Sequence, residues 1–324
     1  MRVKNVIITI IMLSFVGYGG LKLFMWQQAK EDIDKVFLGL SLAMSELYGF
    51  KVIANYKQIS TSILGAVGIK GVSLRFPSLG EEITIAEFKL LERDLDGDSP
   101  QGGLPLRLHF LIDDLNMNIS LLEKLENKHR QLQRQSNIKD DPNALLNRLG
   151  YKKIVQRTND LRALGYDKTS IDMEFDIIFD PVIKEATVIF NQDIKDFARI
   201  DIMIKVVELE NSTRNAVLGV RIKEARLKFV DHSYMNRVLK LYAEDEHVEL
   251  EDFRKRLILG IKQDINNKKI ILSENSIKNI QTFVKKPEKI IFTVYPYNPV
   301  AIESFKHYKA GDVPSLLNLQ VHLE

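Results

Sequence analysis

The chain has 324 residues and a formal net charge of +3, with 46 basic residues, 43 acidic residues and no cysteine. Without cysteine it has no disulfide, thiolate metal ligand or cysteine nucleophile. The basic excess comes from Arg2, Lys4 and Lys22, because residues 1–26 contain no acidic side chain. The rest of the chain is balanced, so we expect no nucleic-acid partner, which would need clustered cations to neutralise phosphates.

The first predicted element is an apolar run at 6–26, interrupted only by Lys22. A helix of this length rises roughly 30 Å, which matches the hydrocarbon core of a bilayer. Lys22 and Trp26 suit the membrane interface at its far end, since a lysine stem can stay in hydrocarbon while its ammonium reaches water. The run therefore predicts a transmembrane anchor whose interface residues are Lys22 and Trp26.

Charge asymmetry predicts the orientation of this anchor. Arg2 and Lys4 precede it, whereas residues 27–50 are net acidic. The positive-inside bias then keeps residues 1–5 in the cytoplasm and exports residues 27–324, in a bacterium from the inner membrane into the periplasm. A cleaved signal and a soluble periplasmic domain are the alternative, because residues 6–16 alone would serve as the apolar region of a signal peptide.

An amphipathic helix is predicted directly after the anchor. Its apolar residues recur at steps of three and four, typical of a helix that packs one side on a sheet. They are Ile33, Val36, Phe37, Leu40, Ala43, Met44 and Leu47.

From Phe50 the apolar period becomes two, which predicts half-buried strands. The runs lie at 50–56, 72–76, 83–90, 106–112, 115–119, 171–179, 186–190, 198–206, 225–229, 290–294 and 317–323. Short connections between many of them favour an antiparallel meander.

The clearest alternation is at 171–179, where aspartates and a glutamate occupy most of the other face. Its apolar residues are Ile171, Met173, Phe175, Ile177 and Phe179. They are the candidate ligand-facing strand, since such a face could line an acyl-chain site; a packed core is the alternative.

Two helical regions accompany the strands. A charged stretch at about 121–165 predicts a peripheral helical insertion, and three helices near 233–245, 249–266 and 273–285 form a helical block at about 233–285. Because strands lie on both sides of this block, the predicted class is α+β: an N-terminal transmembrane helix, then one large antiparallel β-rich domain at 27–324 with peripheral helices.

The sequence predicts no catalytic residues, cofactor or metal site, and hence no enzyme. The six histidines are scattered without ligand spacing. Asp231-His232-Ser233 contains the residue types of a catalytic triad, but adjacent residues cannot generally face one another in a relay. Asp231 is better interpreted as a helix cap.

The order of anchor, amphipathic helix and the strand Ile69-Lys70-Gly71-Val72-Ser73-Leu74-Arg75-Phe76 resembles AsmA-like and related bacterial envelope proteins over about the first ninety residues. The resemblance implies a non-enzymatic role in lipid binding, lipid transfer or envelope maintenance, with the bilayer and a lipid as partners. The helical regions at 121–165 and 233–285 depart from that family's pattern. A scaffolding module that docks envelope proteins through charged helices is the alternative.

Overall fold

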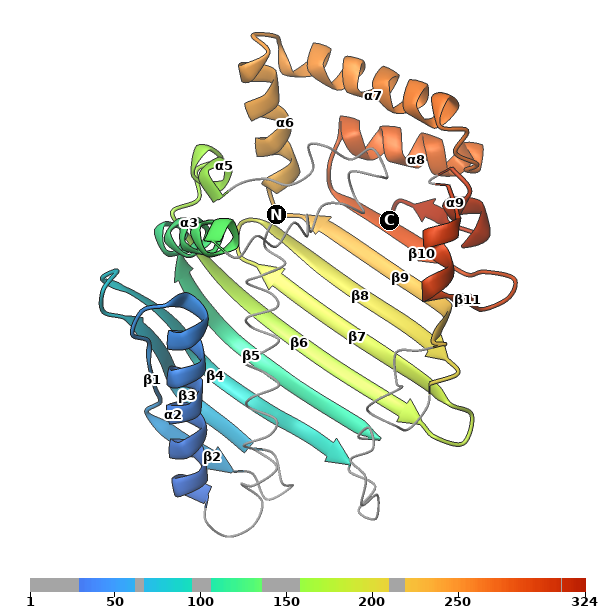
Figure 1. Ribbon diagram of the computed structural model, residues 1–324. Helices are drawn as coiled ribbons and strands as arrows, with labels where there is room; N and C mark the ends of the chain where they lie inside the picture. The colour runs from blue at the N-terminus through green and yellow to red at the C-terminus, as the bar shows by residue number, and fades with distance from the viewer. Residues whose placement is uncertain (1–28, 62–66, 95–105, 136–157, 210–218, 310) are drawn as a thin grey trace. The chain divides into compact units, whose positions relative to one another are not determined.

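The protein is built around an antiparallel sheet with accompanying helices (Figure 1). The computed structural model describes residues 29–61, 67–94, 106–135, 158–209, 219–309 and 311–324. The predicted antiparallel β-rich class with accompanying helices is confirmed. The predicted anchor at 6–26, with Lys22 and Trp26, lies outside the described residues. Within those ranges, no helix has the length and apolarity needed to cross a bilayer.

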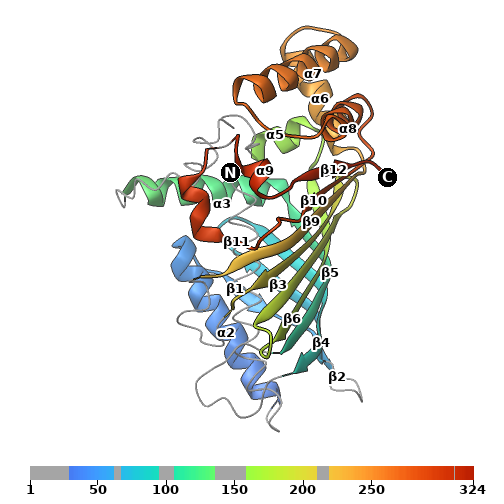
Figure 2. The ribbon, with the colours of Figure 1, turned by 90° about the vertical axis from the view of Figure 1, so that its right-hand side faces the viewer.

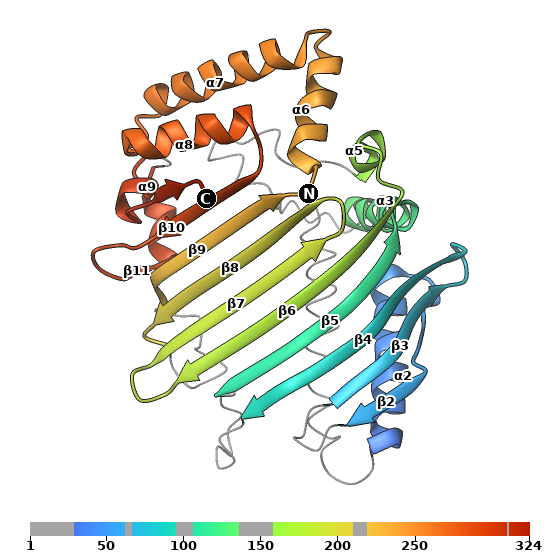
Figure 3. The same ribbon diagram turned by 180° about the vertical axis from the view of Figure 1, so that it is seen from behind.

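The strands follow the order β1-β3-β4-β5-β6-β7-β8-β9-β10-β12, with β2 paired to β3 and β11 to β9. Their bounds are β1 Ile53–Asn55, β2 Gln58–Thr61, β3 Val67–Phe76, β4 Glu81–Asp94, β5 Arg107–Asn118, β6 Lys168–Asp180, β7 Glu185–Ile194, β8 Ala198–Val207, β9 Arg221–Asp231, β10 Lys289–Val294, β11 Val300–Ala301 and β12 Gln320–His322. The predicted meander is clearest from β6 to β9, where each strand pairs antiparallel with the next (Figure 3).

The helices are α2 Ala29–Tyr48, α3 Ile119–Gln135, α5 Thr158–Ala163, α6 Tyr234–Asp245, α7 Leu250–Asn267, α8 Glu274–Lys285 and α9 Val313–Leu316, with a 3-10 helix, η1, at Ile302–His307. Each of α6, α7 and α8 begins and ends within one residue of its predicted bounds. Helices α3 and α5 fall largely in the predicted insertion at 121–165, of which 136–157 lies outside the described residues.

The chain divides into two compact units. Unit 1 comprises Met1–Ser60, Ile69–Glu87 and Asp114–Ser170, and unit 2 comprises Thr61–Gly68, Phe88–Asp113 and Ile171–Glu324. Strands β4, β5 and β6 each contribute residues to both units. Because neither unit is one continuous stretch of chain, joint folding of residues 27–324 stays a prediction for unfolding experiments.

Helix α2 packs against β1 in unit 1 (Figure 2). Its buried side chains recur at three- and four-residue steps, namely Ile33, Phe37, Leu40, Met44 and Tyr48. Leu47, which the sequence placed on this side, is instead 48% exposed. The hydroxyls of Ser41 and Ser45 accept hydrogen bonds from the N–H groups of Ala54 and Val52, both at 2.8 Å. The helix therefore also satisfies backbone donors beside the sheet.

The side of β5 that is buried changes at Asp114. Leu108 and Ile112 are buried before this residue, and Leu115 and Met117 after it, so the buried parity switches. Asp114 has a φ of +51°, a left-handed conformation typical of a bulge that inserts one residue into a strand. The two alternations predicted at 106–112 and 115–119 are therefore one irregular strand.

Ser276 links α8 to the last strand in unit 2. Its buried hydroxyl accepts a hydrogen bond from the Val321 N–H at 3.1 Å, and the Asn279 amide donates to the Val321 carbonyl at 2.8 Å. The strand predicted at 317–323 is shorter than expected, because Leu317 and Leu319 lie in the turn that follows α9. Only 320–322 form β12.

Candidate functional site

Strand β6 carries the five residues predicted to face a ligand. Ile171, Met173 and Phe179 are buried, whereas Phe175 and Ile177 at the middle of the strand are half-buried. The predicted alternation is therefore present. Its apolar side is closed near both ends of β6 and less covered between them.

The strand register extends this half-buried centre across four more strands of unit 2 (Figure 3). Residues opposite one another in antiparallel strands point to the same side of a sheet. The first row runs Phe175, Phe190, Ile202, Leu227, Phe292, and the second runs Ile177, Val188, Ile204, Ala225, Val294. All ten side chains are half-buried, and together they are called the apolar face below.

Two phenylalanines of unit 2 continue the first row beyond β6. The Phe110 ring lies 5.0 Å from the Phe175 ring, and the Phe88 ring lies 5.8 Å from the Phe110 ring. Both are half-buried. At a strand spacing of about 4.8 Å, the row from β4 to β10 is roughly 30 Å wide.

The same side of the sheet is covered where α8 packs on β10 and β12. Phe283 of α8 forms a buried cluster with Ile290 and Val321, and its ring meets Phe229 edge to face at 6.0 Å. Phe292, at the margin of the apolar face, packs against this cluster. A covering layer is thus present at the β10 edge.

The opposite side of these strands is polar. Lys228 and Arg199 lie 3.6 and 2.8 Å from the Asp201 carboxylate, and Lys205 lies 3.7 Å from Glu185. The Arg199–Asp201 pair neutralises charge within β8, and the two lysine pairs neutralise charge between neighbouring strands. The sheet in unit 2 is therefore amphipathic, with its charged pairs on the side opposite the apolar face.

Glu174 and Asp176 on the polar side of β6 have partners on the neighbouring strands β5 and β7. Glu174 accepts hydrogen bonds from Asn191 and His109, each at 2.9 Å, and these partners lower the pKa of Glu174 despite partial burial. Asp176 is only 7% exposed and pairs with Arg107. Its burial differs from the solvent-facing position that the alternation predicted.

The sequence Asp231-His232-Ser233 does not form a triad. Asp231 Oδ1 accepts the Met235 N–H at 2.8 Å, which confirms its role in capping α6. His232 Nε2 pairs with Asp193 at 3.1 Å, and Ser233 Oγ donates to the backbone carbonyl of Asp196 at 2.6 Å. Each side chain has its own partner, so no relay connects the three.

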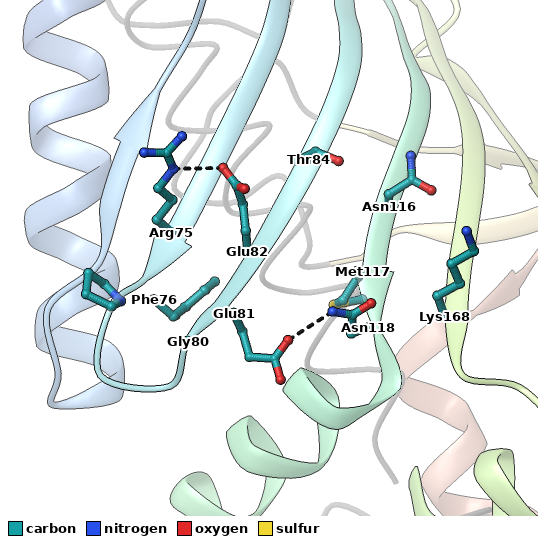
Figure 4. A pocket seen from close by; sticks show the side chains of 11 residues that line it. Arg75, Phe76, Gly80, Glu81, Glu82, Thr84, Asn116, Met117, Asn118 and Lys168 are labelled. Atoms are coloured by element: carbon teal, nitrogen blue, oxygen red, sulfur yellow. Dashed lines mark hydrogen bonds and ion pairs between the residues drawn. The ribbon is translucent and has the colours of Figure 1, made fainter.

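Unit 1 contains an open hollow of about 570 Å³ between β3, β4, β5 and the start of β6 (Figure 4). The carboxylate of Glu81 lines this hollow. It accepts hydrogen bonds from Asn118, Ser120 and Lys124 at 3.0, 2.6 and 2.8 Å. These donors, the Asn118 amide foremost, lower the pKa of Glu81 to about 2. A carboxylate held ionised in this way is poorly suited to exchange protons near neutral pH.

In the part of the chain that the structure describes, no cluster of three or more histidine, aspartate or glutamate side chains could hold a metal ion.

Comparisons with known proteins add little about the chemistry of this protein. A family model described as "Uncharacterized protein" matches residues 187–324. The match begins within β7 and covers all later elements, so it includes strands β7, β8, β9 and β10 of the apolar face from residue 187 onward. No curated protein matches the chain.

Proposed function

We propose that this protein is a non-enzymatic envelope protein that binds the acyl chains of lipids on the apolar face of unit 2. The observation that carries the proposal is the half-burial of ten apolar side chains that adjoin one another across five paired strands. A complete second layer would normally bury the central residues of such a face.

The chemistry of the apolar face favours a lipid chain over a polar ligand. Its ten side chains carry no hydrogen-bonding group, so they offer apolar area and shape but no directional contacts. Burial of apolar surface is worth about 25 cal/mol per Å², and contiguous apolar patches above a few hundred Å² commonly mark binding sites. An acyl chain matches this surface because it too is non-directional.

The expected location fits this ligand. The predicted anchor at 6–26 would hold the domain beside a bilayer, and the AsmA-like order of elements at the start of the chain points to envelope lipid handling. We therefore place the protein at the bacterial inner membrane, with its N-terminus cytoplasmic and residues 27–324 in the periplasm.

The proposal is tested by the lipid content of the purified full chain, measured by native mass spectrometry and solvent extraction. We expect co-purified lipid in the wild type and a reduced amount in Phe175→Trp, because the larger side chain fills space on the face without adding a polar group. A wild-type chain free of lipid would reject the proposal. If Phe175→Trp also melts early in that case, the face is a dense core, since overpacking destabilises such a core.

A scaffolding role is the second candidate, favoured by α7. Ile258 is the buried residue of this 18-residue helix, while Leu259 is 57% exposed. Ion pairs within the helix, such as Arg254 with Glu251 at 2.6 Å, already satisfy part of its charge. A partner would then dock on its remaining surface. Retention of a partner protein that depends on Leu259, with no lipid on the chain, would favour this function.

A further inference from the structure

The turn between β6 and β7 exposes two aliphatic side chains at the end of unit 2's sheet. Val182 is 89% exposed and Ile183 is 61% exposed. They project past the last residues of both strands, at the lower end of β6 and β7 in Figure 1. Turn positions normally favour polar residues. Two adjacent exposed aliphatic residues at the tip of a turn therefore indicate contact with an apolar environment.

Backbone groups at this tip already have hydrogen-bond partners. Asp180 Oδ1 accepts the N–H groups of Val182 and Ile183 at 2.9 and 3.3 Å, and the Lys184 carbonyl accepts the Leu209 N–H at 3.2 Å. An unpaired amide entering hydrocarbon costs several kcal/mol. With these groups paired inside the turn, the tip can leave water at lower cost.

A second projection leaves the sheet near the same end. The strand register places Val294 of β10 level with Ile177 of β6, and Ile177 lies three residues before the end of β6. The next residues expose Tyr295 by 60% and Tyr297 by 91%. Tyr295 also has paired backbone groups, since its N–H donates to the Leu317 carbonyl and its own carbonyl accepts from Asn318, both at 3.1 Å.

We propose that these two projections, named the membrane tip and defined by Val182, Ile183, Tyr295 and Tyr297, insert into the surface of a lipid bilayer. Aliphatic side chains enter the acyl boundary, and tyrosine rings sit at the headgroup level, where their hydroxyls stay wet. The projecting aliphatic turn with paired amides fits a bilayer better than a flat protein partner.

Charge around the turn indicates that insertion, not attraction to anionic lipid, drives this contact. Lys184 and Arg221 are offset by Asp180 and Glu208, and Arg221 pairs with Glu208 at 2.8 Å. A balanced tip gains little from a negative surface potential. It should therefore bind neutral phosphatidylcholine. This inference does not depend on the acyl-chain site, because it rests on residues outside the apolar face.

The test places a tryptophan in the full chain, whose single native tryptophan is Trp26. Trp26→Phe is combined with Val182→Trp, and the protein is reconstituted into phosphatidylcholine vesicles with or without brominated acyl chains. Trp26→Phe with Ile271→Trp is the matched control, since Ile271 is 63% exposed between α7 and α8. Bromine quenches a nearby indole, so the readout reports each position separately even if another segment holds the chain in the bilayer.

We expect brominated lipid to reduce emission from the Val182→Trp protein and to leave the Ile271→Trp protein unchanged. The proposal is overturned if neither protein is quenched, or if both are quenched equally. It is also overturned if the Val182→Trp emission is blue-shifted without lipid and stays unquenched by it, because the tip would then be buried against a second copy of the chain.

Discussion

Arg107 of β5 donates two hydrogen bonds to Asp176 of β6, from Nη2 to Oδ2 at 3.2 Å and from Nε to Oδ1 at 3.4 Å. Arg107→Met should lower the free energy of unfolding by about 1–3 kcal/mol, because the buried carboxylate loses its cation. Urea unfolding of the variant measures this loss. The double variant Arg107→Met/Asp176→Leu should recover most of it, and a double variant as unstable as the single one would contradict this explanation.

Glu81 should make unit 1 sensitive to acid. Its folded pKa of about 2 lies below its ordinary value of 4.5. Because the folded pKa is depressed, the stabilisation is complete above about pH 4.5 and is lost as the pH falls toward 2. Melting temperatures across this window should fall more steeply for the wild type than for Glu81→Gln. Parallel curves for the two proteins would show that the three donors do not favour the ionised carboxylate.

Ser276→Ala should loosen the C-terminal strand. The change leaves the Val321 N–H without its hydroxyl partner in a buried site, at a cost of about 1–3 kcal/mol. Thr282→Ala is the control in the same helix, since its exposed hydroxyl donates only to the Lys278 carbonyl of the preceding turn. Faster amide exchange at Val321 in Ser276→Ala, and not in Thr282→Ala, is the expected result. Equal exchange in both would reject the assigned link.

The predicted membrane topology can be tested with reporter fusions. A reporter fused after Tyr48 should be active only if it is an enzyme that works outside the cytoplasm, because Arg2 and Lys4 resist translocation and the following segment is net acidic. Activity of a cytoplasmic reporter at the same position would overturn both the predicted export and the proposed envelope function.

The sequence predicted local features well and features that depend on pairing poorly. The helix bounds of α6, α7 and α8 could be found because the apolar stripe of each helix is a local pattern, and α8 in addition directly follows a capping serine, Ser273. The burial of Asp176 could not, because it depends on Arg107, which is 69 positions away and reaches it only through strand pairing.

The apolar face illustrates the same limit. Alternation along β6 identified Phe175 and Ile177, but one strand cannot indicate whether its apolar side is covered. The register places Phe190, Ile202 and Leu227 in one row with Phe175, and these residues come from separate strands. The half-burial of the face became visible only when all five strands were assembled.

The most direct test of the acyl-chain site compares two aspartate substitutions on opposite sides of β6. Phe175→Asp places a carboxylate on the apolar face, whereas Ile178→Asp places one at a position that is already 42% exposed on the polar side. Lipid per protein chain is measured by mass spectrometry, and folding is checked by melting temperature. We expect Ile178→Asp to keep the wild-type lipid content and Phe175→Asp to lose it while remaining folded, because a charge is not tolerated against an acyl chain. Equal lipid content in the two folded variants would contradict binding on this face.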